Sequence, residues 1–270
     1  MSILTQTIQL YRDALRKTGQ SFLRGWIVIV GVVLFGVGMV FATSLAAPLG
    51  LVGGFILGAV NALLIGATLA LISDAVLTPR QMHLQDVWES FGQHFWDVMG
   101  VGFVLWIPLM VLEKGMAANP NGAFFGAAIF FLLFVLLNPT PEVIYQVRHG
   151  SPLDVFRESY EFVIENWIEW FLPLAIVVAP LGLSFFVAIT GRLGRGAGLD
   201  FFQLLVFPFS LLTAWLGYLG LSPQTASILV WVLTPPVAIG MMFFRGHLFA
   251  ALHGSSRRQR MFLGRMGTGS

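Results

Sequence analysis

Charged side chains are scarce in this chain, and long stretches contain none at all. Lysine, arginine, aspartate and glutamate make up 10% of the 270 residues, against roughly a quarter in an ordinary soluble domain. Between Arg24 and Asp74 there are 49 consecutive uncharged residues, and between Asp200 and Arg245 there are 44. Because about 20 apolar residues cross a bilayer core as a helix, each stretch is long enough for a pair of spans. The sequence therefore predicts an all-α, polytopic membrane protein.

The chain also lacks the residues and motifs of most catalytic sites. Cysteine is absent, which excludes disulfides, thiolate nucleophiles and cysteine-bound metals. The sequence has no His-Glu-x-x-His or nucleotide-binding motif, and the apolar runs hold no aspartate pair and no serine and histidine arranged for nucleophilic catalysis. From these absences we expect a protein that is not an enzyme, holds no cofactor or metal, and does not bind nucleic acid.

Seven apolar segments are candidate transmembrane spans. Glycine and proline residues, which favour turns, separate most of them, and Ser222 and Pro223 offer an N-cap and a first helical residue for the last one. The segments are residues 26–45, 51–72, 98–112, 123–139, 170–190, 201–221 and 225–244.

The distribution of lysine and arginine predicts how many of these segments cross. Residues 1–24 carry four such cations and residues 245–270 carry five, and cytoplasmic flanks are enriched in them. Both ends are therefore predicted to be cytoplasmic, which requires an even number of crossings. With about six crossings, 12 of the 15 cations lie inside. We expect segment 201–221 to be the one that does not cross, because Asp200 and Gln203 suit a wet or shallow environment.

These patterns predict one membrane domain over residues 1–270. In this prediction residues 1–24 are an amphipathic N-terminal segment and residues 245–270 are a basic cytoplasmic tail. The lipid bilayer surrounds the remaining residues, and the absence of cysteine fits the inner membrane of a bacterium.

Two similar phrases indicate an internal repeat. Residues 86–91 read DVWESF and residues 154–160 read DVFRESY. Each phrase follows an apolar segment and leads into the next, and His-Gly-Ser occurs at residues 149–151 and again at 253–255. The chain therefore resembles a repeated unit of two spans plus an amphipathic cytoplasmic helix. Chance similarity among apolar sequences is the alternative.

Residues 151–170 have the clearest amphipathic pattern. Ser151 is the expected N-cap, Pro152 the first helical residue, and Asp154 lies in the first turn. At about 100° per residue, five carboxylates fall on one side of this helix and large apolar side chains fall on the other. The carboxylates are Asp154, Glu158, Glu161, Glu165 and Glu169, and the apolar residues are Leu153, Phe156, Tyr160, Val163 and Trp167.

The acidic side has two interpretations. It is a solvated helix face, or it binds something basic, either a protein partner or the chain's own tail, in which Arg257, Arg258 and Arg260 are the nearest candidates. An anionic leaflet repels carboxylates, so we expect this side to point toward protein or water.

Residues 79–97 are the counterpart of this helix in the predicted repeat. Leu84, Val87, Trp88, Phe91 and Phe95 share one face, and His83, Asp86, His94 and Asp97 lie opposite. Histidine and carboxylate can ligate metals, but these four groups extend over more than about 15 Å of helix. A solvated polar face is therefore favoured over a metal site.

Small residues recur at four-residue spacing in segment 51–72. A ridge without bulky side chains lets another helix approach closely, so we predict tight helix packing along it, within one chain by default. The ridge consists of Gly54, Gly58, Ala62, Gly66 and Ala70.

Two classes of function fit these observations. The first is a non-enzymatic integral membrane protein that serves as a scaffold, assembly factor or accessory subunit, based on the acidic side and the small-residue ridge. The alternative is a passive transporter or channel for a small or lipidic solute, based on proline-containing spans and the polar residues Asn61, Asn138 and Gln203. Because charges stop at the ends of the predicted spans, an ion-coupled pump is disfavoured.

Overall fold

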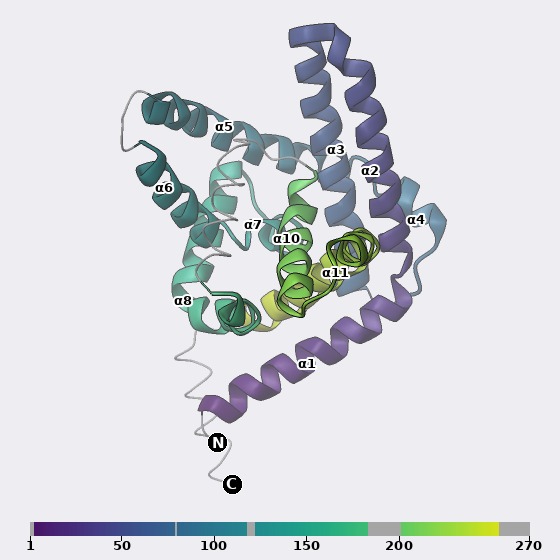
Figure 1. The fold of residues 1–270 in the computed structure, drawn as a ribbon, viewed down its shortest axis with the longest axis vertical. Coiled ribbons are helices and arrows are strands. Elements are labelled where there is room, and N and C mark those ends of the chain that lie inside the picture. The colour runs from purple at the N-terminus through teal and green to yellow at the C-terminus, as the bar shows by residue number, and fades with distance from the viewer. Residues whose placement is uncertain (1–2, 79, 118–121, 183–200, 254–270) are drawn as a thin grey trace.

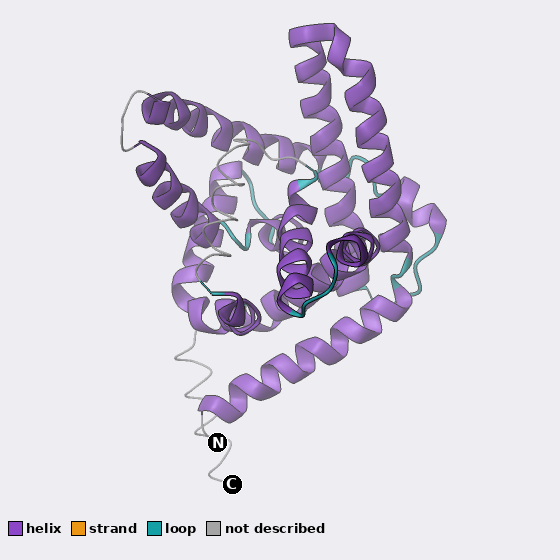
Figure 2. Cartoon of the chain, viewed as in Figure 1, coloured by secondary structure: helices purple, strands orange, loops and turns teal. Residues whose placement is uncertain are grey.

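The chain folds into helices and the short connections between them (Figures 1 and 2). The structure is a computed structural model, and it describes residues 3–78, 80–117, 122–182 and 201–253. Those ranges contain no strand. The all-α membrane fold predicted from the composition is therefore confirmed.

The described residues form helices of very different lengths. In order they are α1 Ile3–Arg24, α2 Ile27–Ala46, the 3-10 turn η1 Ala47–Leu49, α3 Gly50–Leu77, α4 Leu84–Glu89, α5 Phe95–Ala117, α6 Gly122–Leu136, α7 Thr140–Gln146, α8 Pro152–Val178, the 3-10 turn η2 Ala179–Leu181, α10 Gln203–Tyr218 and α11 Pro223–Leu252.

Five helical segments in the described ranges are long and apolar enough to cross a membrane. They are Ile27–Leu77, Phe95–Met116, Phe124–Gln146, Pro152–Leu181 and Pro223–Leu252. The first contains both α2 and α3, which run antiparallel on either side of η1 (Figure 1). Helix α10, in the segment expected not to cross, has 16 residues, or about 24 Å, which is less than the roughly 30 Å of a hydrocarbon core.

The best-packed region lies where the C-terminal halves of α3 and α11 meet α7 and α8. Leu71, Val143, Val155, Phe243 and Phe249 are completely buried there. The outer ends of the α2–α3 and α5–α6 hairpins, which spread apart in Figure 1, instead leave large apolar side chains exposed. Contiguous apolar surface of this kind marks contact with a partner or a membrane, and on spans of this length it faces hydrocarbon.

Helices α8 and α11 are longer than predicted. The acidic helix over residues 151–170 and the following span are one helix, and Asn166 (φ −126°, ψ 16°) marks a kink inside it. Helix α11 continues through Leu252, so the first part of the predicted tail is helical and Arg245 lies within α11.

The predicted single helix over residues 79–97 is interrupted. Helix α4 ends at Glu89, and Gly92 adopts φ +86° before α5 begins at Phe95. Only glycine takes this conformation without a steric penalty, so the presence of glycine at position 92 explains the interruption. Leu84 and Trp88 consequently point outward, whereas Val87 is buried against α2.

Candidate functional site on helix α8

The acidic helix begins as the sequence predicts. Ser151 is the N-cap of α8, and its hydroxyl accepts a hydrogen bond from the Asp154 backbone N–H at 3.3 Å. The Asp154 carboxylate accepts from the Ser151 hydroxyl at 2.9 Å and from the Gly150 N–H at 3.3 Å. All three hydrogen bonds stabilise the helix N-terminus. Asp154 is therefore a capping residue as well as a member of the acidic side.

Helix α8 has three sides rather than the two that the sequence predicts. One side packs into the core through Val155, Ser159, Phe162 and Asn166. The acidic side borders it. The third side is apolar yet exposed, and it includes Leu153, Tyr160 and Trp167 from the predicted apolar side; of that set, Val163 is buried and Phe156 is partly buried.

Beyond the capping residue Asp154, the acidic side presents the exposed Glu161 and Glu165 and the half-buried Glu158, and we call these three residues the acidic face. Glu161 accepts a hydrogen bond from Arg157 Nε at 2.7 Å, between two exposed side chains. Within the described residues no ion pair involves Glu165. Glu169, at the far end of the predicted set, is buried. The acidic face is thus three carboxylates with one local cation, Arg157.

His253 brings the end of α11 to the acidic face. Its Nδ1 lies 3.6 Å from Glu158 Oε1, and its ring stacks on Phe249 with the centroids 5.1 Å apart. Arg257, Arg258 and Arg260 follow within seven residues but lie outside the described residues. Contact between them and the acidic face stays a prediction.

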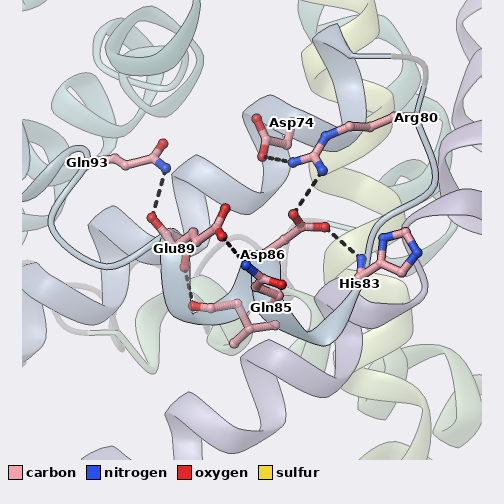
Figure 3. Close-up of polar contacts among 9 residues, drawn as sticks. Asp74, Arg80, His83, Gln85, Asp86, Glu89 and Gln93 are labelled. Atoms are coloured by element: carbon pink, nitrogen blue, oxygen red, sulfur yellow. Dashed lines mark hydrogen bonds and ion pairs between the residues drawn. The ribbon is translucent and has the colours of Figure 1, made fainter.

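Helix α4 carries a second polar cluster, centred on Asp86 (Figure 3). Asp86 is buried; its Oδ1 lies 2.9 Å from Arg80 Nη1, and its Oδ2 accepts from the His83 N–H at 2.6 Å. Arg80 also contacts Asp74 at 3.1 Å, which connects α4 to the end of α3. Burial by itself raises the pKa of a carboxyl, but the His83 N–H and the Arg80 guanidinium outweigh it and hold the pKa of Asp86 below its usual value.

The four residues considered as metal ligands take part in different contacts. Asp86 pairs with Arg80, whereas Asp97 Oδ2 lies 3.4 Å from His94 Nδ1 and Asp97 Oδ1 lies 3.2 Å from His149 Nε2. In the part of the chain that the structure describes, no three histidine, aspartate or glutamate side chains are placed to hold a metal ion. Asp97 instead links the start of α5 to the connection before α8.

The two repeated phrases occupy corresponding positions. Asp86 and Asp154 are each the third residue of their helix. Ser90 and Ser159 are both buried, and their hydroxyls donate to the carbonyls of Val87 (2.7 Å) and Val155 (2.8 Å). The phrases diverge after these serines, because the chain turns at Gly92 while α8 continues. Ser90 caps the end of α4 whereas Ser159 lies inside α8, so the repeat stays a prediction.

A buried ion pair near α8 was missed in the sequence. Arg245 Nε and Nη2 donate to Glu142 Oε1 and Oε2, both at 2.8 Å. Glu142 on α7 is 2% exposed. The guanidinium also donates to the Asn138 carbonyl and lies 5.2 Å from the ring centre of Trp170, whose Nε1 donates to Asn138 Oδ1 at 2.8 Å. Bidentate hydrogen bonds and the aromatic ring counteract the cost of burying the Glu142 carboxylate beside the partly exposed Arg245.

Both charges lie just beyond the predicted spans 123–139 and 225–244, so the interpretation that charges stop at the ends of the spans stays a prediction. The candidate span Phe124–Gln146 includes Glu142, and Pro223–Leu252 includes Arg245. The sequence signal was present, since each charge lies beside a long apolar run, but the partners are 103 residues apart. Only the folded chain shows that the two charges neutralise each other.

The small-residue ridge on α3 divides into two halves. Ala62, Gly66 and Ala70 are buried, and a Cβ placed on Gly66 would lie 3.0 Å from the His94 carbonyl carbon. A Cβ on Gly54 or Gly58 would meet no atom of the described residues within 4 Å. The half that contains Ala62, Gly66 and Ala70 therefore packs within the chain against the α4–α5 connection. Packing along the half that contains Gly54 and Gly58 stays a prediction.

The fold and these contacts define the class of the protein as a polytopic helical membrane protein with polar clusters at the helix ends. Comparison of the chain with models of protein families, with curated proteins and with solved structures gives no match.

Proposed function

We propose that the chain is a non-enzymatic integral membrane protein that serves as a scaffold, assembly factor or accessory subunit, and that it holds a cationic partner at the acidic face. The observation that carries this proposal is the exposure of Glu161 and Glu165, with the half-buried Glu158 beside them, on a helix whose neighbouring side is locked into the core. A partner that binds there is held in a fixed orientation relative to the membrane spans.

The charge of the acidic face supports a cationic partner. Like charges three or four residues apart destabilise an exposed helix by a few tenths of a kcal/mol per pair. Arg157 forms an ion pair with Glu161, and His253 lies 3.6 Å from Glu158. A lysine- or arginine-rich segment would offset the remaining repulsion. The nearest such segment is the chain's own tail, and a basic surface of another protein has the same chemistry.

The same proposal places the protein in a bacterial inner membrane with both ends and the acidic face in the cytoplasm. Six helices, α2, α3, α5, α6, α8 and α11, then cross. This orientation keeps 12 of the 15 lysine and arginine residues on the cytoplasmic side.

The alternative, a passive transporter or channel, has less support from its own key residues. Asn138 contacts Trp170, and Asn61 Oδ1 accepts a hydrogen bond from the Phe201 N–H. These amides connect α8 to the α6–α7 turn and α3 to the residues before α10. A solute path would have to break contacts that hold the bundle together.

The proposal is tested by replacing Glu158, Glu161 and Glu165 with glutamine. We expect the triple variant to lose a co-purifying protein in mild detergent, or to expose its tail to proteolysis after Arg257. Molar salt should have the same effect on the unmodified protein, because the Debye length falls to about 3 Å. The matched control removes two exposed carboxylates elsewhere, Asp13→Asn with Glu89→Gln.

The two positive outcomes identify the partner. Release of a protein without faster tail cleavage identifies a separate subunit, and faster cleavage alone identifies the tail. If neither changes at low or high salt, the acidic face is a solvated surface and the proposed function is refuted.

A further inference from the structure

Helix α1 is fixed to the bundle along one side. The Ser21 hydroxyl donates to the Ala75 carbonyl of α3 at 2.8 Å and lies 2.9 Å from Nε2 of His247 on α11. The Tyr11 hydroxyl donates to the Glu169 carbonyl of α8 at 2.8 Å, and Ala14 is buried between these contacts. The anchors are about 15 Å apart along the helix. Helix α1 is therefore held against the C-terminal parts of α3 and α11 and the middle of α8 (Figure 1).

The outward side of α1 combines alkyl side chains with arginines. Ile8, Leu15 and Leu23 are 59%, 60% and 80% exposed, and Arg12 and Arg16 are exposed among them. At about 100° per residue, these five residues fall within an arc of about 100°, well away from Ala14 and Ser21. Three alkyl side chains held in place and left uncovered require an apolar neighbour.

The position of α1 identifies that neighbour as the membrane surface. Only Gly25 and Trp26 separate α1 from α2, whose outward side chains Val37 and Phe41 face hydrocarbon. Trp26 is itself exposed at this corner, and tryptophan is enriched at the level of the lipid headgroups. The start of the first span therefore fixes the end of α1 at the membrane boundary.

The charges on α1 identify the kind of lipid. Within the described residues no ion pair involves Arg12 or Arg16, and Asp13 and Lys17 lie outside the arc that these arginines share with Leu15. Helices that lie in the membrane interface pair an apolar side with basic residues, which attract anionic lipids. We propose that the outward side of α1 is a binding surface for anionic phospholipid headgroups, with Ile8, Leu15 and Leu23 inserted at the headgroup boundary.

The absence of cysteine allows a direct test on the full chain. Leu15→Cys and Gln20→Cys are each labelled with an environment-sensitive fluorophore, and the labelled proteins are placed in nanodiscs that contain a lipid spin-labelled near its headgroup. Gln20 is exposed on a different side of α1, so it serves as the matched control. The nanodiscs contain either zwitterionic lipid alone or the same lipid mixed with anionic phosphatidylglycerol.

We expect the label at Leu15 to be quenched by the spin-labelled lipid at least twice as strongly as the label at Gln20, and more strongly when anionic lipid is present. Arg12→Gln with Arg16→Gln should remove the effect of the anionic lipid, since each cation near such a surface contributes about a fivefold change in affinity. Both arginines are exposed, so folding should not depend on them.

Two results would overturn the proposal. Equal quenching at Leu15 and Gln20 in both lipids would show that α1 does not lie on the bilayer. Weak quenching of the Leu15 label in the nanodiscs, both by the spin-labelled lipid and by an aqueous quencher, would show that protein, either another molecule or a second copy, covers this side. The acidic face takes no part in these measurements, so their outcome is independent of the proposed function.

Discussion

The packing of α3 predicts opposite effects for one substitution at two glycines of the same helix. At Gly66 a Cβ would lie 3.0 Å from the His94 carbonyl carbon, 3.1 Å from the Phe95 nitrogen and 3.2 Å from the His94 oxygen. All three are backbone atoms at the start of α5, and a backbone moves less readily than the end of a flexible side chain. At Gly58 the same Cβ would meet no described atom within 4 Å.

The magnitudes follow from two terms. Alanine is favoured over glycine in a helix interior by about 0.5 to 1 kcal/mol, and this gain applies at both positions. Overpacking costs about 1 to 3 kcal/mol, and it applies only at Gly66. We therefore expect Gly58→Ala to leave the free energy of unfolding unchanged or raise it by up to about 1 kcal/mol. Gly66→Ala should be less stable than Gly58→Ala by about 1 to 3 kcal/mol.

The assay is thermal unfolding of both variants in the same detergent, followed by the loss of the monodisperse elution peak. Both variants carry the same substitution in the same helix, so the effect of helix propensity largely cancels between them. The difference between their melting temperatures therefore reports the contact with His94 and Phe95. Equal melting temperatures for the two variants would refute the close approach of α5 to α3. A larger loss at Gly58 would show that the upper half of the ridge packs against protein.

Two further predictions concern the ion pairs. Arg245→Ala should lower the free energy of unfolding by about 3 to 5 kcal/mol, because it leaves Glu142 buried without a cation. The double replacement Glu142→Leu with Arg245→Met should lower it less. A lower melting temperature in detergent for the double variant than for the single one would contradict this. The folded pKa of Asp86 lies below its ordinary value, so its contribution to stability is present above the ordinary pKa of about 3.9 and is lost as the pH falls through the folded pKa. Acid unfolding should accordingly be less steep for Asp86→Asn, and identical acid curves would contradict the Asp86 network.

Local features of the fold could be predicted from the sequence because they depend on neighbouring residues. Apolar runs indicated the spans, and Ser151 and Ser222 were identified as N-caps, which accept from Asp154 and Thr225 in the structure. Segment 201–221, singled out for its polar residues, forms a helix too short to cross the full hydrocarbon core. In each of these cases the deciding interaction lies within a few residues of the feature.

Features that depend on distant residues could not be predicted. Helical periodicity separated acidic from apolar residues on α8, but it could not show that Leu153, Tyr160 and Trp167 stay exposed while Ser159 and Asn166 enter the core. That choice depends on where α7 and α11 pack. The Glu142–Arg245 pair has the same origin, since neither residue has a suitable partner nearby in the chain.

Polar contacts are distributed unevenly between the two ends of the bundle. Hydrogen bonds that join helices through charged side chains, such as Arg80 to Asp86 and Arg245 to Glu142, occur at the ends of α3, α7 and α11. At the opposite end of the α2–α3 hairpin, Thr43 and Ser44 donate only to carbonyls of their own helix, those of Met39 and Val40. Polar side chains surrounded by lipid have to hydrogen-bond to the backbone of their own helix. Charged networks, in contrast, need nearby water or headgroups to solvate the charge that the ion pairs do not neutralise. The end with the networks, which carries α1 and the acidic face, is therefore the end that water reaches within the bundle.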